Sequence, residues 1–365
     1  MPLQGKGFFT WKVPECEGGN TDAIATLAKS GNMTHVLIKI ANGILAYNID
    51  PTSGVDYAKK LSQSLHQREL KAWGWHYVYG NNPIGEADIA IQRIQEVNVD
   101  GYVIDAETEY KQPGRKEAAK RFMARLRASL PNFPIALSSF RYPSYHPELP
   151  WKEFLEKCDY NMPQVYWMQA HNAGEQLRQS VRQFQNMVPS RPIIPTGAAF
   201  RESGWQPTSA EVLDFLQTAK SLNLSGANFW EWSDCRARLP DVWQTIYNFP
   251  WDPPQKDIAE KYIDALNTRN PSQVVSLYTS SAVHITAART IQGTAAITAW
   301  YTSFFNQILP NGTFTLTGYS GTGNSRHFTW TAVATTGRVL NGNDTLGLLN
   351  DKIAYHYCFF TLSPA

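Results

Sequence analysis

Short apolar runs alternate with segments of helical spacing along the first 250 residues of the chain. Eight such runs follow one another at intervals of roughly 30 residues, the length of a strand plus a returning helix. The runs are Lys6–Trp11, His35–Ala41, Ala72–Tyr79, Gly101–Asp105, Pro134–Phe140, Tyr160–Trp167, Pro192–Phe200 and Ala227–Trp232. Nearly continuous apolar runs are typical of parallel strands that are covered on both faces.

The segments between the runs have the spacing of amphipathic helices. In residues 115–130, one helical stripe contains Ala118, Phe122, Leu126 and Leu130. Eight strand–helix units in about 250 residues predict a (β/α)8 TIM barrel of the α/β class. An open doubly wound sheet is the alternative, although no Gly-rich phosphate-binding turn follows the first strand.

The pattern changes after Trp251, where Asp252-Pro253-Pro254 follows. Two consecutive prolines cannot continue a helix and favour an extended chain. Beyond them, residues 256–365 carry only 12 of the 64 formal charges but 17 threonines. We therefore expect a barrel domain in residues 1–250, a linker in 251–255 and a smaller domain in 256–365.

The smaller domain begins with helical patterns and ends with β-rich stretches. Residues 257–268 and 295–309 each place apolar side chains on one helical face. The β-rich stretches, separated by turn signals, are 313–319, 326–335, 345–349 and 354–362. This order predicts an α+β layout with the helices first and a curved antiparallel sheet after them.

Composition indicates a folded protein without a strongly charged partner. Of the 365 residues, 43% are hydrophobic and 18% are charged, which suffices to bury a core. The net charge of +2 gives no reason to expect nucleic acid or an acidic membrane surface as the main partner. The longest stretch without a formal charge, residues 290–325, is rich in Thr, Gly, Ser and Asn and predicts no membrane span.

Location and metal content follow from what the sequence lacks. The opening residues contain no apolar run of a signal peptide, so the cytoplasm is the default location and export without a leader stays an open alternative. The cysteines are scattered, without a C-x-x-C pair, at Cys16, Cys158, Cys235 and Cys358. This spacing predicts neither a zinc site nor a disulfide framework, and no His/Asp/Glu cluster has metal-ligand spacing. We therefore predict no metal and no cofactor.

Candidate chemistry lies at the end of the fourth predicted strand, since barrel enzymes place their reacting groups at the C-terminal ends of strands. Strand alternation puts Val103, Asp105 and Glu107 on one face. Two carboxylates at one strand mouth suit glycoside cleavage, in which one stays ionised and the other keeps a raised pKa and protonates the leaving oxygen. The structural alternative is that the two acids cap the next helix or pair with Arg141 or a neighbouring lysine.

These motifs resemble two families of barrel glycosidases. Gly74-Trp75-His76-Tyr77 followed by Ile104-Asp105-Ala106-Glu107 is similar to the lysozyme-type family 25 glycoside hydrolases. Phe229-Trp230-Glu231-Trp232 resembles the tryptophan-bearing last strand of family 18 chitinase-like barrels, and Met162-Pro163-Gln164-Val165-Tyr166 resembles their sixth strand.

The resemblance implies catalytic roles for the two acids. Glu107 is the expected proton donor, and Asp105 is expected to orient a substrate acetamido group or to stabilise the developing cation. It also implies that Gln164 and Tyr166 line the sugar site and Trp230 forms its floor. The whole predicted substrate-binding set is His76, Gln164, Tyr166, Trp230, Glu231 and Trp232.

Several positions depart from these families. The first strand, Gly7-Phe8-Phe9-Thr10-Trp11, lacks the family 25 aspartate, and Gln164 stands where that family has an acid. Val103 occupies the first of the alternate positions that precede the chitinase-like glutamate. A histidine such as His76 is also more often a core residue than a catalytic one.

The C-terminal segment resembles the SnoaL-like branch of the nuclear-transport-factor-2-like superfamily. The resemblance rests on Tyr262-Ile263-Asp264-Ala265-Leu266-Asn267, Val275-Ser276-Leu277-Tyr278-Thr279, Ile291-Gln292-Gly293-Thr294-Ala295-Ala296-Ile297 and Asp351-Lys352-Ile353. It implies a cone with an apolar pocket, dimerisation through the sheet, and a binding or assembly module rather than a second enzyme. The pocket candidates are Tyr278, His284, Trp300, Phe304, Trp330 and His356, with no obvious buried carboxylate.

Two hypotheses follow for the whole chain. The first is a retaining glycoside hydrolase that acts on an N-acetylated glycan, with peptidoglycan favoured over chitin. The second is a non-catalytic glycan-binding or assembly protein built on a degenerate glycosidase barrel. In both, the partner is a glycan, and a homodimer would form through the C-terminal domain.

Overall fold

A computed structural model describes residues 3–251, 256–321 and 323–364. The chain divides into two compact units, Met1–Pro254 and Gln255–Ala365, and each is described by itself below. The predicted linker, residues 251–255, lies outside the described residues except for Trp251, whose side chain is buried. Among the described residues, no helix is both long and apolar enough to cross a membrane.

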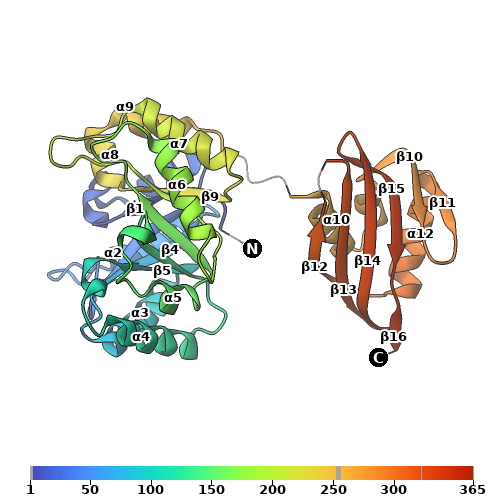
Figure 1. Ribbon diagram of the computed structural model, residues 1–365, viewed down its shortest axis with the longest axis horizontal. Helices are drawn as coiled ribbons and strands as arrows, with labels where there is room; N and C mark the ends of the chain where they lie inside the picture. Colours follow the sequence, from blue (N-terminus) through green and yellow to red (C-terminus); the bar gives the residue numbers. More distant parts are fainter. Residues whose placement is uncertain (1–2, 252–255, 322, 365) are drawn as a thin grey trace. The chain divides into compact units, whose positions relative to one another are not determined.

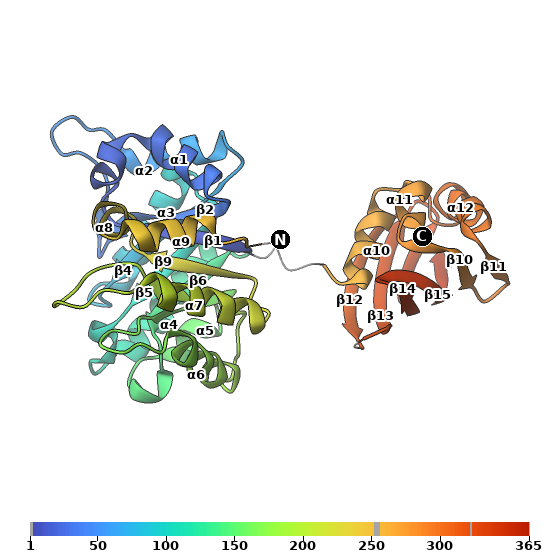
Figure 2. The same cartoon turned by 90° about the horizontal axis from the view of Figure 1, so that it is seen from above.

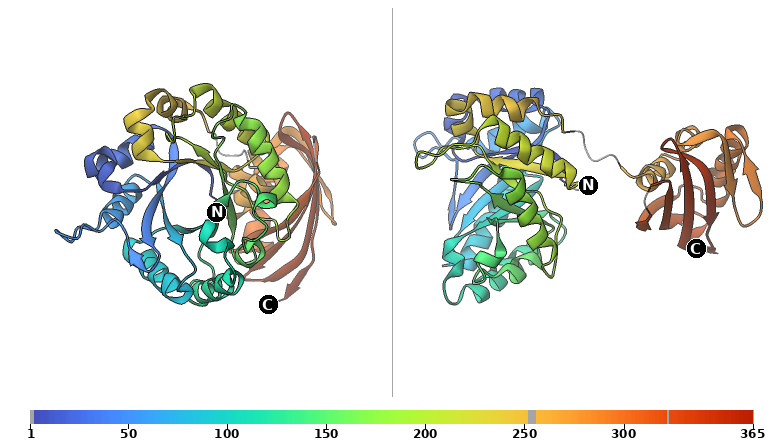
Figure 3. Two further views of the ribbon diagram at one scale, coloured as in Figure 1. Left: turned by 60° about the vertical axis from the view of Figure 1, so that its left-hand side comes forward. Right: turned by 45° about the horizontal axis from the view of Figure 1, so that its top comes forward.

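Eight parallel strands close into a barrel in the first unit, because β1 pairs with both β2 and β9 (Figure 1). The left panel of Figure 3 shows the strands surrounded by a ring of helices. The barrel strands are β1 (Gly5–Thr10), β2 (Met33–Asn42), β4 (Lys71–Val78), β5 (Gly101–Ala106), β6 (Ile135–Phe140), β7 (Tyr160–Val165), β8 (Thr196–Ala198) and β9 (Gly226–Trp230). The short strand β3 (Leu45–Ala46) pairs antiparallel with β2. The predicted (β/α)8 barrel is confirmed.

Helices follow the strands and cover the outside of the barrel. They are α1 (Thr21–Ser30), α2 (Tyr57–His66), α3 (Pro83–Val97), α4 (Arg115–Ser129), α5 (Trp151–Leu155), α6 (Ala173–Gln185), α7 (Ser209–Ser221), α8 (Trp232–Arg238) and α9 (Pro240–Asn248). Short 3-10 turns are η1 (Val13–Glu15), η2 (Glu17–Gly19), η3 (Thr108–Lys111) and η4 (Pro143–Tyr145). In α4, the predicted stripe of Ala118, Phe122 and Leu126 is buried. Its burial explains why a helix with many charges packs stably on the barrel.

Strand alternation sorts the barrel side chains into two cores. On β2, Val36 and Ile38 point outward and pack in the large cluster under the helices, whereas Leu37 points into the barrel. The interior cluster consists of Leu3, Phe9, Leu37, Trp73, Trp75, Val103, Ala136, Met162 and Ile194. Residues two positions further along these strands therefore reach the C-terminal mouth of the barrel.

The second unit is a curved sheet covered on one face by helices (Figure 2). The helices are α10 (Ile258–Asn267), α11 (Pro271–Val275) and α12 (Thr294–Ser303), which continues into the π-helical turn η5 (Phe304–Ile308). The strands are β10 (Tyr278–Ile285), β11 (Thr290–Gln292), β12 (Thr313–Ser320), β13 (Ser325–Ala334), β14 (Gly337–Leu349), β15 (Lys352–Phe359) and β16 (Leu362–Pro364). Their order is β11-β10-β15-β14-β13-β12, and β16 also pairs with β14.

Three expectations for this unit were wrong. The sheet is not wholly antiparallel, because β10 runs parallel to β15, and β10 and β11 precede α12 rather than follow the helices. The turn expected before Thr345 is also strand, since β14 begins at Gly337. Gly342 is required there by packing rather than by a turn: a Cβ atom would lie 2.2 Å from the Trp330 ring.

Lys6 ties the first strand to the last helix of the barrel. Its side chain is fully buried, and its ammonium donates hydrogen bonds to the carbonyl oxygens of Ile246 (2.8 Å), Tyr247 (3.0 Å) and Phe249 (2.6 Å). These carbonyls lie at the C-terminal end of α9, where intrahelical donors run out, although the Ile246 carbonyl also accepts a 3.3 Å hydrogen bond from the Phe249 N–H. One lysine therefore satisfies the end of the helix that completes the ring.

We predict that Lys6→Met destabilises the barrel by about 3 kcal/mol, because it leaves buried carbonyl groups without donors. Urea unfolding followed by tryptophan fluorescence measures this loss, since ten of the twelve tryptophans lie in residues 1–251. Lys29→Met is the matched control: Lys29 is half exposed and forms a 3.5 Å ion pair with Glu69, so a loss of about 0.5 kcal/mol or less is expected. Equal losses in the two variants would contradict this role of Lys6.

Candidate functional site

An amide group lies between the two predicted catalytic carboxyls at the barrel mouth. Asp105 is on β5, Glu107 follows that strand, and Gln164 is on β7. The Gln164 Nε2 atom donates to Asp105 Oδ1 at 2.9 Å and to Glu107 Oε1 at 2.9 Å. It also lies 3.3 Å from Ser138 Oγ at the end of β6. Three neighbouring strands thus hold the two acids in one hydrogen-bonded group.

Burial changes the acidity of both carboxyls. Asp105 is only 7% exposed, and burial followed by the neighbouring Glu107 carboxyl raises its pKa well above the ordinary value. Burial also raises the pKa of Glu107, while the hydrogen bond from Gln164 opposes that rise. The pair therefore keeps one proton to higher pH than ordinary carboxyls do, and it can offer one acid and one base.

The structural alternative for these acids does not account for their position. Glu107 precedes η3, but its side chain makes no capping hydrogen bond there. Arg141 donates instead to the carbonyl oxygen of Tyr166. Within the described residues, neither carboxylate forms an ion pair, so the group is neither a helix cap nor a salt bridge.

Lys39 is a site residue that sequence reasoning missed. It is 5% exposed at an inward position on β2, and its ammonium lies 4.5 Å from the ring centroid of Tyr47 and 4.6 Å from that of Trp75. Burial lowers the pKa of Lys39 to about 8. Its positive charge in turn lowers the pKa of Asp105 and opposes the effect of burial there. The available signal was a lysine within an otherwise apolar strand.

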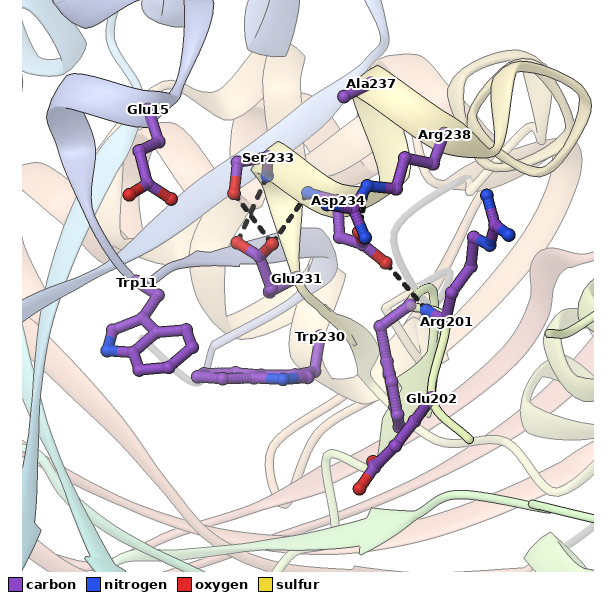
Figure 4. A pocket seen from close by; sticks show the side chains of 11 residues that line it. Trp11, Glu15, Arg201, Glu202, Trp230, Glu231, Ser233, Asp234, Ala237 and Arg238 are labelled. Carbon is purple, nitrogen blue, oxygen red and sulfur yellow. Dashed lines mark hydrogen bonds and ion pairs between the residues drawn. The ribbon is translucent and has the colours of Figure 1, made fainter. Parts of the chain in front are cut away.

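An open pocket of about 550 Å³ lies where the chain leaves the C-terminal ends of β1, β8 and β9 (Figure 4). Its lining residues are Trp11, Glu15, Phe200, Arg201, Glu202, Trp230, Glu231, Ser233, Asp234, Ala237 and Arg238. Trp11 is 43% exposed, and its ring lies 6.2 Å from that of Trp230 at an interplanar angle of 36°. Asp105 and Glu107 do not line this pocket.

Aromatic contacts connect the pocket with the carboxyl group. Trp230 packs against Trp75 at 5.2 Å, and the Lys39 ammonium lies 4.6 Å from the centroid of the Trp75 ring. Phe200 packs against Tyr166 at 5.1 Å, and burial followed by the charges of both acids raises the pKa of the Tyr166 hydroxyl. Of the predicted residues, Trp230 therefore lines the pocket, and Tyr166 contacts the pocket residue Phe200 and lies near both acids.

The other predicted substrate-binding residues lie elsewhere. His76 is fully buried, with its ring nitrogens 2.8 Å from the Tyr102 hydroxyl and 2.7 Å from the Gly43 carbonyl, so neither is left for a sugar. Trp232 is fully buried and packs against Trp243 at 4.8 Å. The structure does not bring either residue to the mouth.

Glu231 lines the pocket but already has partners. Its carboxylate accepts hydrogen bonds from the backbone N–H groups of Ser233 and Asp234 and from the Ser233 hydroxyl, as the dashed lines in Figure 4 show. It is thus the N-cap of α8. Burial raises the pKa of Glu231, although these hydrogen bonds lower it in part.

The C-terminal unit contains a buried carboxylate, contrary to expectation. Asp344 on β14 is fully buried and accepts hydrogen bonds from Trp330 Nε1 at 3.0 Å and from His356 Nε2 at 3.0 Å. The sequence does not reveal this burial, because Asn341-Gly342-Asn343-Asp344 is typical of an exposed turn. The predicted pocket candidates Tyr278, His284, Trp300, Phe304, Trp330 and His356 are all buried here. Burial lowers the pKa of His284 to about 2.

A pocket of about 380 Å³ lies next to these buried residues, and its lining is mostly apolar. It is lined by Thr286, Ala287, Ala288, Arg289, Trp300, Ile308, Cys358 and Phe360. Of the predicted candidates, only Trp300 is among these lining residues.

Comparison with known proteins gives matches for the second unit. Among solved structures, the chain is similar to a putative ketosteroid isomerase from Kribbella flavida, with 17% identity, 30% of this chain and 78% of that chain covered, and a TM-score of 0.26. A putative isomerase of the SnoaL-like family from Agrobacterium tumefaciens has 24% identity, 28% and 94% coverage, and a TM-score of 0.26. A putative polyketide cyclase from Sinorhizobium meliloti has 14% identity, 28% and 94% coverage, and a TM-score of 0.26.

No curated protein matches the chain. The sequence model that describes the SnoaL-like domain matches residues 259–356, nearly the whole of the second unit, and leaves the barrel outside the match. The C-terminal unit is therefore a SnoaL-like domain, joined to a barrel of eight parallel strands.

Proposed function

We propose that the barrel is a retaining glycoside hydrolase that acts on an N-acetylated glycan, with peptidoglycan as the expected substrate. One observation carries the proposal: a single Gln164 nitrogen lies 2.9 Å from an oxygen of each acid, so the two oxygens lie within twice that distance of each other. Carboxyl groups are about 5–5.5 Å apart in retaining glycosidases and about 6.5–9.5 Å apart in inverting ones.

The two acids divide the chemistry between them. Glu107, which is half-buried and nearer the solvent, would donate a proton to the leaving oxygen and then take one from water. Asp105 would assist attack by the substrate's own acetamido oxygen or stabilise the developing cation. Gln164 would hold the two carboxyls in place, and Lys39 would favour the ionised form of Asp105.

The aromatic wall of the pocket supports sugar binding. Trp11 and Trp230 present ring faces beside a pocket that carboxylates and arginines also line. An aromatic face packs on the C–H face of a sugar ring, while the hydroxyls keep hydrogen bonds to polar groups at the edge. The remaining polar groups of the glycan would meet Glu202 and Arg201 there.

A second candidate function is glycan binding without cleavage. It is favoured by the first strand, which has Phe9 and Thr10 where an acid would be expected, and by the separation of the pocket from the acid pair. The SnoaL-like domain would serve as a binding or dimerisation module in either case. Its sheet carries exposed aromatic side chains at every second residue of β15: Tyr355 (41%), Tyr357 (39%) and Phe359 (41%).

We predict that Glu107→Gln abolishes the release of reducing ends from purified peptidoglycan, because the amide cannot donate the proton. The variant should fold and keep its melting temperature, since Gln preserves shape and relieves repulsion between the carboxyls. Glu117→Gln, at an exposed position on α4, should retain full activity. Activity that survives in Glu107→Gln would contradict the assignment, and an inactive wild type that sediments with the glycan would favour the binding function.

We predict that Lys39→Met moves the alkaline limb of the kcat/KM profile to higher pH by about one unit. The sign follows from the charge: Lys39 lowers the pKa of Asp105, so its loss lets the pair keep its shared proton to higher pH. Lys59→Met, an exposed lysine on α2, is the control and should leave the limb in place. A limb that stays or moves to lower pH in Lys39→Met would overturn this role.

We predict that Tyr357→Lys converts a dimer into a monomer, because a charge would lie in the apolar centre of the β15 surface. Light scattering coupled to size-exclusion chromatography measures the mass directly. Tyr319→Lys changes a more exposed aromatic (52%) on β12 and should leave the dimer intact. A monomeric wild type would show that this surface does not join two copies.

A further inference from the structure

Four buried residues with metal-binding side chains meet on adjacent strands of the SnoaL-like domain. In the antiparallel pair β14–β15, Asp344 stands opposite Cys358. In the parallel pair β10–β15, His284 stands opposite His356. All four side chains are at most 2% exposed. Strand pairing therefore brings together residues that lie as much as 74 positions apart in the sequence.

The distances within this group suit a single ion. One ligand atom each from Asp344, His356 and Cys358 lie within 4.8 Å of one another. A carboxylate oxygen, an imidazole nitrogen and a thiolate sulfur bind Zn²⁺ and related ions at about 2.0–2.3 Å. Three ligand atoms at these separations can surround one ion without a large movement of the backbone.

His284 provides an independent indication of a missing partner. Its side chain is fully buried, and neither ring nitrogen has a hydrogen-bond partner among the described residues. Its ring lies 4.4 Å from the ring of His356, measured between centroids. Leaving a buried polar group without a partner costs about 1–3 kcal/mol, so native proteins rarely do so without a bound group nearby.

The surrounding hydrogen bonds would orient the ligands. Trp330 Nε1 donates to Asp344 Oδ1 at 3.0 Å, and the Tyr278 hydroxyl lies 2.6 Å from His356 Nδ1. The remaining atoms, Asp344 Oδ2 and His356 Nε2, face each other at 3.0 Å. In metal sites, the second nitrogen of a ligating histidine and the second oxygen of a carboxylate are commonly held in this way.

We propose that Asp344, His356 and Cys358 bind a divalent transition-metal ion, with His284 as the fourth ligand. The aspartate and the thiolate would balance the two positive charges, as a buried site requires. Binding would release the thiol proton of Cys358 to solvent, and the proton of His356 would reside on Nδ1, toward Tyr278. Cys358 also lines the 380 Å³ pocket, which gives the ion a route of entry. This site is separate from the glycosidase chemistry of the barrel.

Cobalt titration of the full-length, EDTA-treated protein tests the proposal. We expect Co²⁺ to bind in a one-to-one ratio, with tetrahedral visible bands and a thiolate-to-cobalt charge-transfer band in the near ultraviolet. Cys358→Ser should abolish the charge-transfer band. Cys158→Ser, at a buried cysteine in the barrel, should keep it. A folded wild type without these bands, or a band that persists in Cys358→Ser, would overturn the site.

His284→Phe provides a second test that does not depend on the folding of the cysteine variant. Phenylalanine keeps an aromatic ring against Trp300 and His356 but removes both nitrogens. We expect the affinity for Co²⁺ to fall at least about tenfold while the circular dichroism spectrum stays unchanged. Wild-type affinity in His284→Phe would overturn its assignment as a ligand.

Discussion

Strand alternation in a closed barrel is the constraint on which the rest of the first unit depends. Because β1 pairs on both sides, every strand must send alternate side chains to a shared interior. That rule packs Leu37 and Val103 at the centre and carries Lys39 and Asp105 to the mouth two positions later. The mouth therefore collects charged groups above an apolar floor. Low solvent access there is what raises the pKa of the carboxyls and lowers that of the lysine.

The sequence predicted the barrel well because each strand is a separate apolar run. It also put Asp105, Glu107 and Gln164 at or near the ends of predicted strands, and in the structure Gln164 on β7 donates hydrogen bonds to both acids across β6. It could not decide which face of a strand holds a given residue when both faces are buried. His76 follows an inward tryptophan and so points outward, away from the mouth.

The lack of information about side-chain direction and strand register also explains which site residues the sequence analysis missed. Lys39 looked like part of an apolar strand, and only the rings around its ammonium make it a feature of the site. In the second unit, the predicted strand at residues 345–349 was shorter than the observed β14. The polar and glycine residues in the middle of β14 resemble a turn, but they face the domain interior or fit against Trp330. Asp344 and Cys358 become neighbours only through the register of β14 and β15, which spacing along the chain does not reveal.

The proposed hydrolysis depends most on the closeness of the two carboxyls at the barrel mouth, and the stereochemistry of cleavage tests that dependence most directly. Proton NMR, recorded during the first minutes of hydrolysis of a β-linked N-acetylated oligosaccharide, distinguishes the anomers of the new reducing end. Acids this close predict a β-anomer, formed with retention, before mutarotation begins. An α-anomer as the first product would contradict the roles given to Asp105 and Glu107.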